Sequence, residues 1–452
     1  MHSLLILIFA ALSGPGIQRA PLLAIRNVAV VDVERGVVRP HMTVVIGDGR
    51  IIAVGKSWRS RIPDGAQVID GTNRFLIPGL WDMHVHALFD EVPEKFFPLF
   101  LAYGVTSIRD MGTDRSPAGI AALKSSGPRI HAAGPWVDGP HPVNPGSIAV
   151  SNASDARAAV DSLVAQGVDF IKVYSLLPRD AYVAIADEAH RKGIPFAGHV
   201  PETVTAWEAS EAGQRSIEHL YGVLRACSSD EASMLEEMTH RMADADAATS
   251  AVPLLISQSL HAIDTFDAGK AAMLAEVFKR NRTALDPTLI WHRTRARTAD
   301  DAFLADPRTR QIPDWMGEVW ANRMAGRRKS ETPADIAARK RLLDRYMMLT
   351  RFFAERGVVV LAGTDTGEPY CFPGSSLHEE LALLVEAGLS PARALRAATS
   401  DAAAFMGERD LGTIAAGKRA DVVLLDANPL VDIHNTTKIR TVISRGVITG
   451  GR

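Results

Sequence analysis

The sequence predicts an α/β fold, in which a (β/α)8 TIM barrel is joined to a small β-sandwich domain built from both chain ends. Two observations support this prediction. The middle of the chain alternates short apolar segments with amphipathic ones, which is the order of strands and helices in a parallel barrel. Both ends instead alternate apolar and polar residues between turn signals, as half-buried strands do. We expect residues 21–77 and 408–452 to form the sandwich and residues 78–407 to form the barrel.

The first 20 residues have the features of a signal peptide. The apolar run Leu4–Leu12 is too short to span a bilayer, which takes about 20 apolar residues. It has the length of a secretory signal core, and the sequence SGPG interrupts it. No Lys or Arg precedes the run and no clear cleavage site follows it, so a buried strand is the alternative. A cleaved signal would place the protein in the periplasm or outside the cell, and a buried strand would place it in the cytoplasm. In neither case do we expect a stable membrane span.

The β-rich ends follow the signal and close the chain. Residues 22–55 alternate apolar and polar side chains, with turn signals at ERG and GDGR. The same pattern returns in residues 411–430 and 439–451. One small domain that uses both ends explains this pattern more economically than two separate β flaps.

The middle of the chain contains eight strand candidates, and helical patterns such as residues 179–193 and 206–214 lie between most of them. Eight such repeats predict a barrel of about 250 residues or more. The connection after the seventh strand, residues 291–357, is long and charged. Because loops after barrel strands lie on the active face, we expect this insertion to roof a site, with most of its arginines in solvent. The strand candidates are residues 75–87, 104–112, 129–138, 169–175, 194–200, 216–223, 283–290 and 358–367.

Composition excludes several classes of protein. Apolar residues make up 47% of the chain and charged residues 23%, which is ordinary for a globular protein. The formal net charge is −2, and no nucleic-acid motif is present, so we expect no nucleic-acid partner. Two cysteines are too few for a disulfide framework. A metal site in this chain would therefore use His, Asp, Glu or a modified Lys.

Polar residues gather where the predicted barrel strands end. His84 and His86 are one residue apart on a strand, so their side chains point the same way. Strand ends meet at one mouth of a barrel, and uncompensated ionisable groups crowded there would be costly. A metal centre removes that cost, and a lysine that reacts with CO₂ becomes a carbamate, an anionic ligand able to bridge two cations. The residues that meet at this mouth are His84, His86, Lys172, His199, His219 and Asp365.

These motifs carry a resemblance to a known family. PGLWDMHVH, IKVYS, GHVP, IEHL and LAGTDTG follow one another in the order seen in the amidohydrolase superfamily of metal-dependent hydrolases. The terminal segment LGTIAAGKRADVVLLD resembles the family's small β domain. The chain is similar in particular to the branch of Xaa-Pro dipeptidases, N-acyl amino acid carboxypeptidases and imidazolonepropionase-like proteins, which residues 376–407 also resemble.

The resemblance implies a binuclear metal centre with two divalent ions. Zinc is expected, with manganese or cobalt as the alternatives. His84, His86 and Asp365 would hold the first ion, and His199 and His219 the second. The carbamate of Lys172 and a hydroxide would bridge them, with Asp365 as general base and acid. The family's deaminases and true imidazolonepropionases use one metal and lack this lysine, so Lys172 argues against those activities.

The expected reaction is hydrolysis of an amide (C–N) bond in a small molecule, a dipeptide or an N-acyl amino acid. Lactone, cyclic amide or phosphotriester hydrolysis at the same centre is the alternative, and a non-catalytic binding or scaffold protein is the remote one. The resemblance also allows a homo-oligomer.

Tyr174, on the face of Lys172, is a candidate catalytic hydroxyl or else a packing aromatic in the barrel. The loops after strands three, seven and eight are expected to shape the substrate pocket. The substrate-binding candidates on these loops are His141, Trp291, His292 and Tyr370, with a surface position as the alternative for His141.

Overall fold

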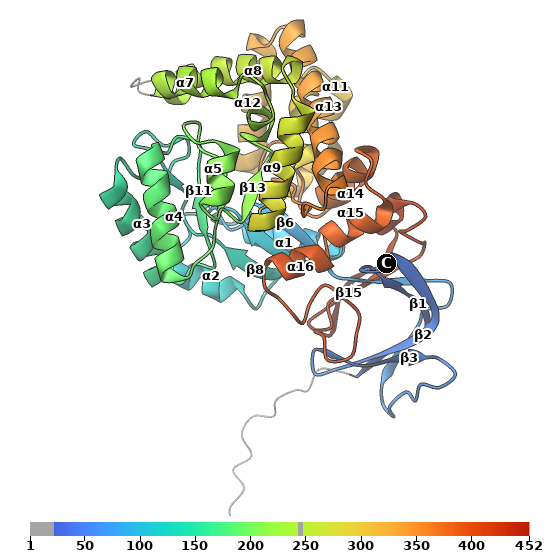
Figure 1. Cartoon of the computed structure of the whole chain (residues 1–452). Coiled ribbons are helices and arrows are strands. Elements are labelled where there is room, and N and C mark those ends of the chain that lie inside the picture. The colour runs from blue at the N-terminus through green and yellow to red at the C-terminus, as the bar shows by residue number, and fades with distance from the viewer. Residues whose placement is uncertain (1–21, 243–246, 452) are drawn as a thin grey trace, which may run out of the picture.

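The computed structural model describes residues 22–242 and 247–451 (Figure 1). A barrel surrounded by helices lies beside a smaller sheet, and strands from both ends of the described chain build that sheet. The predicted fold class is confirmed. The predicted leader, residues 1–20, lies outside the described residues.

The terminal domain is one eight-stranded sheet, in the order β17-β16-β15-β5-β1-β2-β3 with β4 beside β1. The ladder between β5 and β15 joins the two ends of the chain. The sheet bends around a core of its own, to which Ile25 of β1, Ile51 of β3 and Ile443 of β16 contribute. The eight strands are β1 (Leu23–Asp32), β2 (Val37–Gly47), β3 (Arg50–Lys56), β4 (Gln67–Asp70), β5 (Phe75–Pro78), β15 (Val422–Leu425), β16 (Ile439–Ser444) and β17 (Val447–Gly451).

The barrel strands form two parallel ladders, β6-β7-β8 and β10-β9-β11-β12-β13-β14. The amide of Asp169 donates to the carbonyl of Ala132 (3.0 Å) and joins the ladders between β8 and β11. Strands such as β7 and β11 are buried on both faces, which explains their largely apolar sequences. The strands are β6 (Leu80–Val85), β7 (Val105–Asp110), β8 (Arg129–Ala132), β9 (Val137–Asp138), β10 (Ile148–Ala149), β11 (Ile171–Val173), β12 (Phe196–Gly198), β13 (Ser216–Glu218) and β14 (Ala284–Asp286).

The predicted eighth strand, residues 358–367, is wrong in its detail. It forms two isolated parallel bridges, to Leu285 of β14 and to Val85 of β6, and no continuous strand. At Gly363 a Cβ atom would lie 2.5 Å from Asp286 Oδ2 and 2.6 Å from the Cβ of His84, so the backbone passes too close for a regular pleat with side chains. Asp365 adopts a left-handed φ of 60°. The segment therefore closes the barrel as irregular chain.

Helices cover the outside of the barrel (Figure 1). The predicted helices at residues 179–193 and 206–214 are present as α4, which ends at left-handed Gly193, and as the shorter α5, which Thr205 begins with a capping box. The helices of this layer are α1 (Val92–Ala102), α2 (Pro117–Leu123), α3 (Ala153–Gln166), α4 (Arg179–Lys192), α5 (Ala206–Glu211), α9 (Ala268–Asn281), α14 (Ser375–Glu386), α15 (Pro391–Ala397) and α16 (Ser400–Phe405), with the 3-10 turn η2 (Ile433–Thr437) packed on α14.

Two excursions from the barrel pack against each other above its mouth. The first follows β13, and its helix α8 contacts α13 of the second, the predicted insertion after β14. No helix in the described stretches is both long and apolar enough to cross a membrane. The first excursion holds α6 (Val223–Ala226), α7 (Glu231–Met242) and α8 (Ala247–Asp264), and the second holds α10 (Leu289–Arg295), α11 (Asp301–Leu304), η1 (Pro307–Gln311), α12 (Asp314–Ser330) and α13 (Pro333–Glu355).

Candidate metal centre

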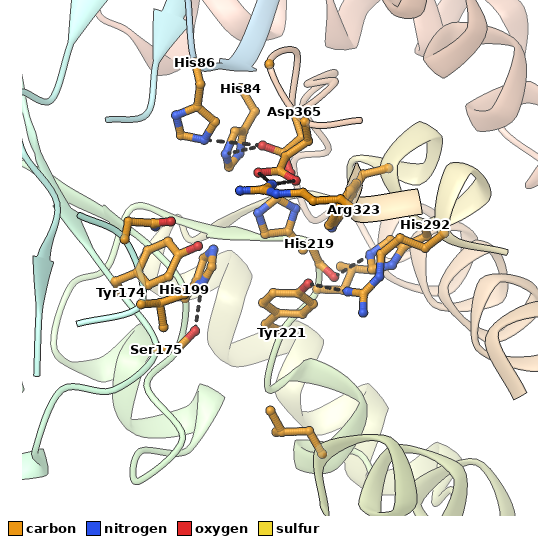
Figure 2. Close-up of a pocket in the computed structure, with 18 of the residues that line it drawn as sticks. His84, His86, Tyr174, Ser175, His199, His219, Tyr221, His292, Arg323 and Asp365 are labelled. Atoms are coloured by element: carbon orange, nitrogen blue, oxygen red, sulfur yellow. Dashed lines mark hydrogen bonds and ion pairs between the residues drawn. The ribbon is translucent and has the colours of Figure 1, made fainter. Parts of the chain in front are cut away.

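The predicted ligands meet at the carboxyl ends of the barrel strands (Figure 2). Asp365 Oδ1 lies 3.4 Å from Nε2 of His84 and 3.4 Å from Nε2 of His86. The ring of His219 is 4.6 Å from that of His84 and 5.0 Å from that of His199, measured between centroids. A chain of imidazoles therefore runs from the first predicted metal position to the second.

Each of these four histidines is oriented through Nδ1. Because carboxylate and carbonyl oxygens only accept, Nδ1 of His84 donates to Glu218 and Nδ1 of His86 donates to the Gly112 carbonyl. Their Nε2 lone pairs then face the centre, as metal-binding histidines require. The Nδ1 contacts are His84 to Glu218 Oε2 (2.8 Å), His86 to Gly112 O (3.2 Å), His199 to Ser175 Oγ (2.8 Å) and His219 to Thr288 Oγ1 (2.7 Å).

The first group of ligands fits a divalent cation. Potential ligand atoms of His84, His86 and Asp365 all lie within 4.8 Å of one another. With both Nδ1 atoms protonated, three lone pairs face one another, and a cation between them relieves the repulsion. Two imidazole nitrogens and a carboxylate oxygen suit zinc.

The direction of the pKa shift agrees with this role for three of the four histidines. Burial, followed by the charge of Lys172, lowers the pKa of His84 and His199 well below the usual value. Burial and the neighbouring His84 do the same to the pKa of His219. Burial also lowers the pKa of His86, but the contacts with Asp365 outweigh it and raise that pKa overall. Neutral imidazoles are the form that binds metal.

Lys172 is fully buried beside this centre, and its ammonium has no hydrogen-bond partner among the described residues. Burial lowers its pKa to about 8, against the opposing effect of Glu218 and Asp365. An unpaired buried ammonium is costly. Conversion to an anionic ligand between two cations would remove that cost, and the neutral amine that burial favours is the form that adds CO₂.

A buried ionic network that the sequence analysis missed supports the centre from below. Nη2 of Arg109 lies 2.9 Å from Glu218 Oε2 and 3.2 Å from Asp286 Oδ2. His84, Glu218 and Asp286 also have ligand atoms close together, but Arg109 donates hydrogen bonds to both carboxylates, and burial, followed by the charge of Glu218, raises the pKa of Asp286 well above its usual value. This cluster therefore holds His84 in place and is not a second metal site. The available signal was the position of Glu218, directly before His219 in the motif IEHL.

The backbone is strained at the centre. His219 (φ 59°), Asp365 (φ 60°) and Thr288 (φ 44°) are all left-handed, which is unusual for residues with a side chain and most so for β-branched Thr288. Glu380 accepts hydrogen bonds from the amides of Leu289 (3.0 Å) and Ile290 (2.7 Å), which fixes the chain directly after Thr288. Such strain persists where the surroundings determine the conformation, and it is found at functional sites.

A cavity of about 810 Å³ opens from the ligands. Tyr174 lines it and stacks on His199 with a centroid distance of 4.1 Å. Burial raises the pKa of the Tyr174 hydroxyl, against a hydrogen bond with Asn144, so the group remains a donor. On another side the ring of Trp136 lies 5.6 Å from His86 and stacks on Phe89. The cavity therefore offers both polar and aromatic walls.

The substrate-pocket predictions divide into two groups. Trp291 and His292 line the cavity, and His292 Nε2 donates to the His219 carbonyl (3.0 Å). Burial lowers the pKa of His292 to about 3, against the opposing effect of this hydrogen bond. His141 is exposed and does not line the cavity, because its loop presents residues 143–145 instead. Tyr370 also lies outside the lining: its hydroxyl donates to Leu304 O (3.0 Å) and its ring packs on Phe303.

Several cavity residues were not predicted. Tyr221 lies between the two excursions and the ligands, with its ring 5.1 Å from His199 and 4.9 Å from His219. It follows His219 by two residues, which was the signal that could have found it. Helix α8 also reaches the cavity, and so do arginines from both excursions, of which Arg295 and Arg327 were expected in solvent with the rest of their insertion.

Comparisons with known proteins agree with this architecture. A bottromycin amidohydrolase has a TM-score of 0.73 at 28% identity, covering 95% of this chain and 87% of its own. A proposed prolidase from Bifidobacterium longum has a TM-score of 0.67 at 25% identity, covering 96% of both chains. An adenine deaminase from Paracoccus denitrificans is 37% identical over 92 residues, which are 20% of this chain, and the chain spans only 15% of that relative. The amidohydrolase family model matches residues 75–449, and the chain belongs to that family.

Proposed function

We propose that this protein is a metal-dependent hydrolase of amide bonds in a small molecule, a dipeptide or an N-acyl amino acid. One observation carries the proposal. The lone pairs of His84, His86 and Asp365 converge within 4.8 Å at the floor of a cavity large enough for such a molecule. Membership of the amidohydrolase family and the likeness to an amidohydrolase and a proposed prolidase support it.

The ligand set supports two divalent ions, zinc being the expected one. His84, His86 and Asp365 would hold the first ion, His199 and His219 the second, and the carbamate of Lys172 would join them. When bound, the ions would acidify a water molecule that they share and polarise the scissile carbonyl. Lys172 also distinguishes this site from the one-metal deaminase type of centre.

The residues of the chain have separate tasks in this reaction. Asp365 accepts the proton of the attacking water and passes it to the leaving nitrogen. The Tyr174 hydroxyl donates a hydrogen bond to the substrate. Glu218 and Arg109 hold His84, so that its lone pair stays aimed while charge develops.

The experiment is a hydrolysis screen combined with metal analysis. Zinc-loaded protein, with bicarbonate present, is tested on Xaa-Pro dipeptides, other dipeptides and N-acyl amino acids, with Asp365→Asn as the blank. We expect two metal ions per chain and hydrolysis that depends on the residue that follows the scissile bond. Silence across the library with two ions bound would favour lactones, cyclic amides or phosphotriesters. A protein that binds no metal would favour a binding or scaffold role.

A further inference from the structure

Two arginines in the cavity wall lack an acidic partner. Arg295 of α10 and Arg327 of α12 both contact Trp291, with their guanidinium carbons 5.2 Å and 5.8 Å from its ring. Both side chains are partly buried and line the cavity. Neither forms an ion pair with a carboxylate in the described parts of the chain, and Nε of Arg295 and Nη1 of Arg327 are buried without a hydrogen-bond partner.

The other cavity arginines are neutralised. Their ion pairs are Arg225 with Glu202 (3.6 Å), Arg323 with Glu368 (3.2 Å) and Arg339 with Glu331 (2.6 Å). Arg295 and Arg327 therefore have no carboxylate at ion-pair distance in the described chain, and Glu368 and Glu331, which act on Arg327 from farther away, are paired with Arg323 and Arg339. Burial, followed by the charges of Arg295 and Arg339, lowers the pKa of Arg327 to about 10, so the cation is held there against desolvation and repulsion.

The wall is close enough to the ligands to act on the same molecule. Nη1 of Arg295 lies 3.5 Å from the Tyr221 hydroxyl, and the Tyr221 ring contacts both His199 and His219 (Figure 2). One aromatic side chain thus separates the guanidinium from the second pair of predicted ligands. A group bound at the arginines and a scissile bond at the ligands fit within one small substrate.

We propose that Arg295 and Arg327 form an anion subsite for a part of the substrate that carries two carboxylates. Resting on the proposed function, this assigns the substrate class as an amide of an acidic amino acid, N-acylated aspartate or glutamate, or a dipeptide that ends in one. Two unpaired guanidinium groups match two carboxylates in charge, and their planar donors bind carboxylates in pairs. A single carboxylate would leave one buried cation uncompensated.

Binding to the metal-loaded protein tests the subsite without turnover. Glutarate and butyrate, which carry two carboxylates and one, are compared by calorimetry. We expect glutarate to bind at least about tenfold tighter, and Arg327→Met to abolish the difference. The matched control is Arg328→Met, since the adjacent Arg328 is exposed and pairs with Asp301, and it keeps the wild-type preference. Equal affinities for the two acids in the wild-type protein would overturn the proposal.

The Tm of Arg327→Met distinguishes a binding role of Arg327 from a structural one, because the two roles predict shifts in opposite directions. Arg327→Met removes a desolvated cation that its neighbours repel, so the Tm without ligand should rise. An arginine that stabilises the fold would give a lower Tm on substitution. A lower Tm for Arg327→Met together with an unchanged glutarate preference would overturn the subsite.

Kinetics separate this proposal from the one on which it rests. N-benzoyl-glutamate, N-benzoyl-glutamine and N-benzoyl-glutamine amide are closely matched in shape and carry two, one and no carboxylates. We expect kcat/KM to fall at each loss of charge, and Arg327→Met to affect the glutamate compound most. Equal kcat/KM values for the three compounds would overturn the proposed anion subsite but would still support the proposed amide hydrolase activity. The opposite result is that glutarate binds tightly and in an Arg327-dependent way while none of the three compounds is hydrolysed. That result would support the anion subsite and count against the amide hydrolase activity.

Discussion

The two halves of the cavity treat buried charge differently. In the metal half, Arg109 forms ion pairs with Glu218 and Asp286, and every predicted histidine ligand has a partner at Nδ1. In the wall formed by α10 and α12, Arg295 and Arg327 have no acidic partner in the described chain. In the metal half the buried atoms without a hydrogen-bond partner in the described chain include Nε2 of His84 and Nζ of Lys172, both of which belong to the predicted metal ligands. The second half is complete only with an anion, which is a group that a substrate brings.

The difference also follows the chain. The metal half lies on barrel strands and the short turns after them, whereas the arginine wall comes from the insertion. Chemistry held on rigid strand ends and recognition held on long connections is the usual division in a barrel enzyme.

The largest effect is expected for Asp365→Asn. The amide keeps an oxygen that can bind metal but cannot accept the proton of the attacking water, so kcat should fall by about 10²–10⁴-fold. Metal content measured on the same samples should stay the same. Glutarate affinity should also be unchanged, because the arginine wall is untouched. Turnover close to wild type would refute the role of Asp365.

Lys172→Met should break the metal half in a different way. The methionine keeps an apolar stem but cannot form a carbamate, so we expect fewer than two ions per chain and turnover reduced by at least about 100-fold. Bicarbonate should raise metal content in the wild type and not in the variant. The metal-free variant should unfold at a higher temperature than the metal-free wild type, because a buried unpaired ammonium is gone. Two tightly bound ions in Lys172→Met would contradict the bridging role.

The sequence predicts the metal half well, because its ligands lie at strand ends and strand order follows chain order. The i,i+2 spacing of His84 and His86 already places both side chains on one face. The irregular closure at Gly363 was not predictable, since it results from contacts with Asp286 and His84 that form only in the closed barrel. Likewise, no local pattern separates Arg327, which lines the cavity, from Arg328, which faces solvent. Such residues depend on how the two excursions pack.

His378, a buried histidine outside the cavity, is expected to make the free energy of unfolding depend on pH. Burial lowers the pKa of His378 to about 4, although Nε2 donates to the Tyr103 carbonyl (3.0 Å). Between the unfolded value of 6.5 and pH 4 the unfolded chain binds the proton first, so stability falls as pH falls. The loss approaches roughly 3 kcal/mol at pH 4.

The test is denaturant unfolding of the wild type and of His378→Gln between pH 4 and 7. The glutamine cannot titrate, so the slope of unfolding free energy against pH should be flatter by up to one proton. His190→Gln, at an exposed position on α4, is the control and should keep the wild-type slope. Equal slopes for wild type and His378→Gln would mean that this histidine titrates alike in both states.

The smallest effect is expected for Tyr174→Phe, on the border of the two halves. The ring stacks on His199 in either variant, so metal content and Tm should not change. Loss of one hydrogen bond to the substrate should raise KM by about 2–10-fold, from roughly 0.5–1.5 kcal/mol. Tyr182→Phe is the matched control, because its hydroxyl donates to Gln214 in the core and its loss should lower Tm without changing KM. Unchanged kinetics in Tyr174→Phe would reduce this residue to a packing partner of His199, and recognition would then rest on the insertion alone.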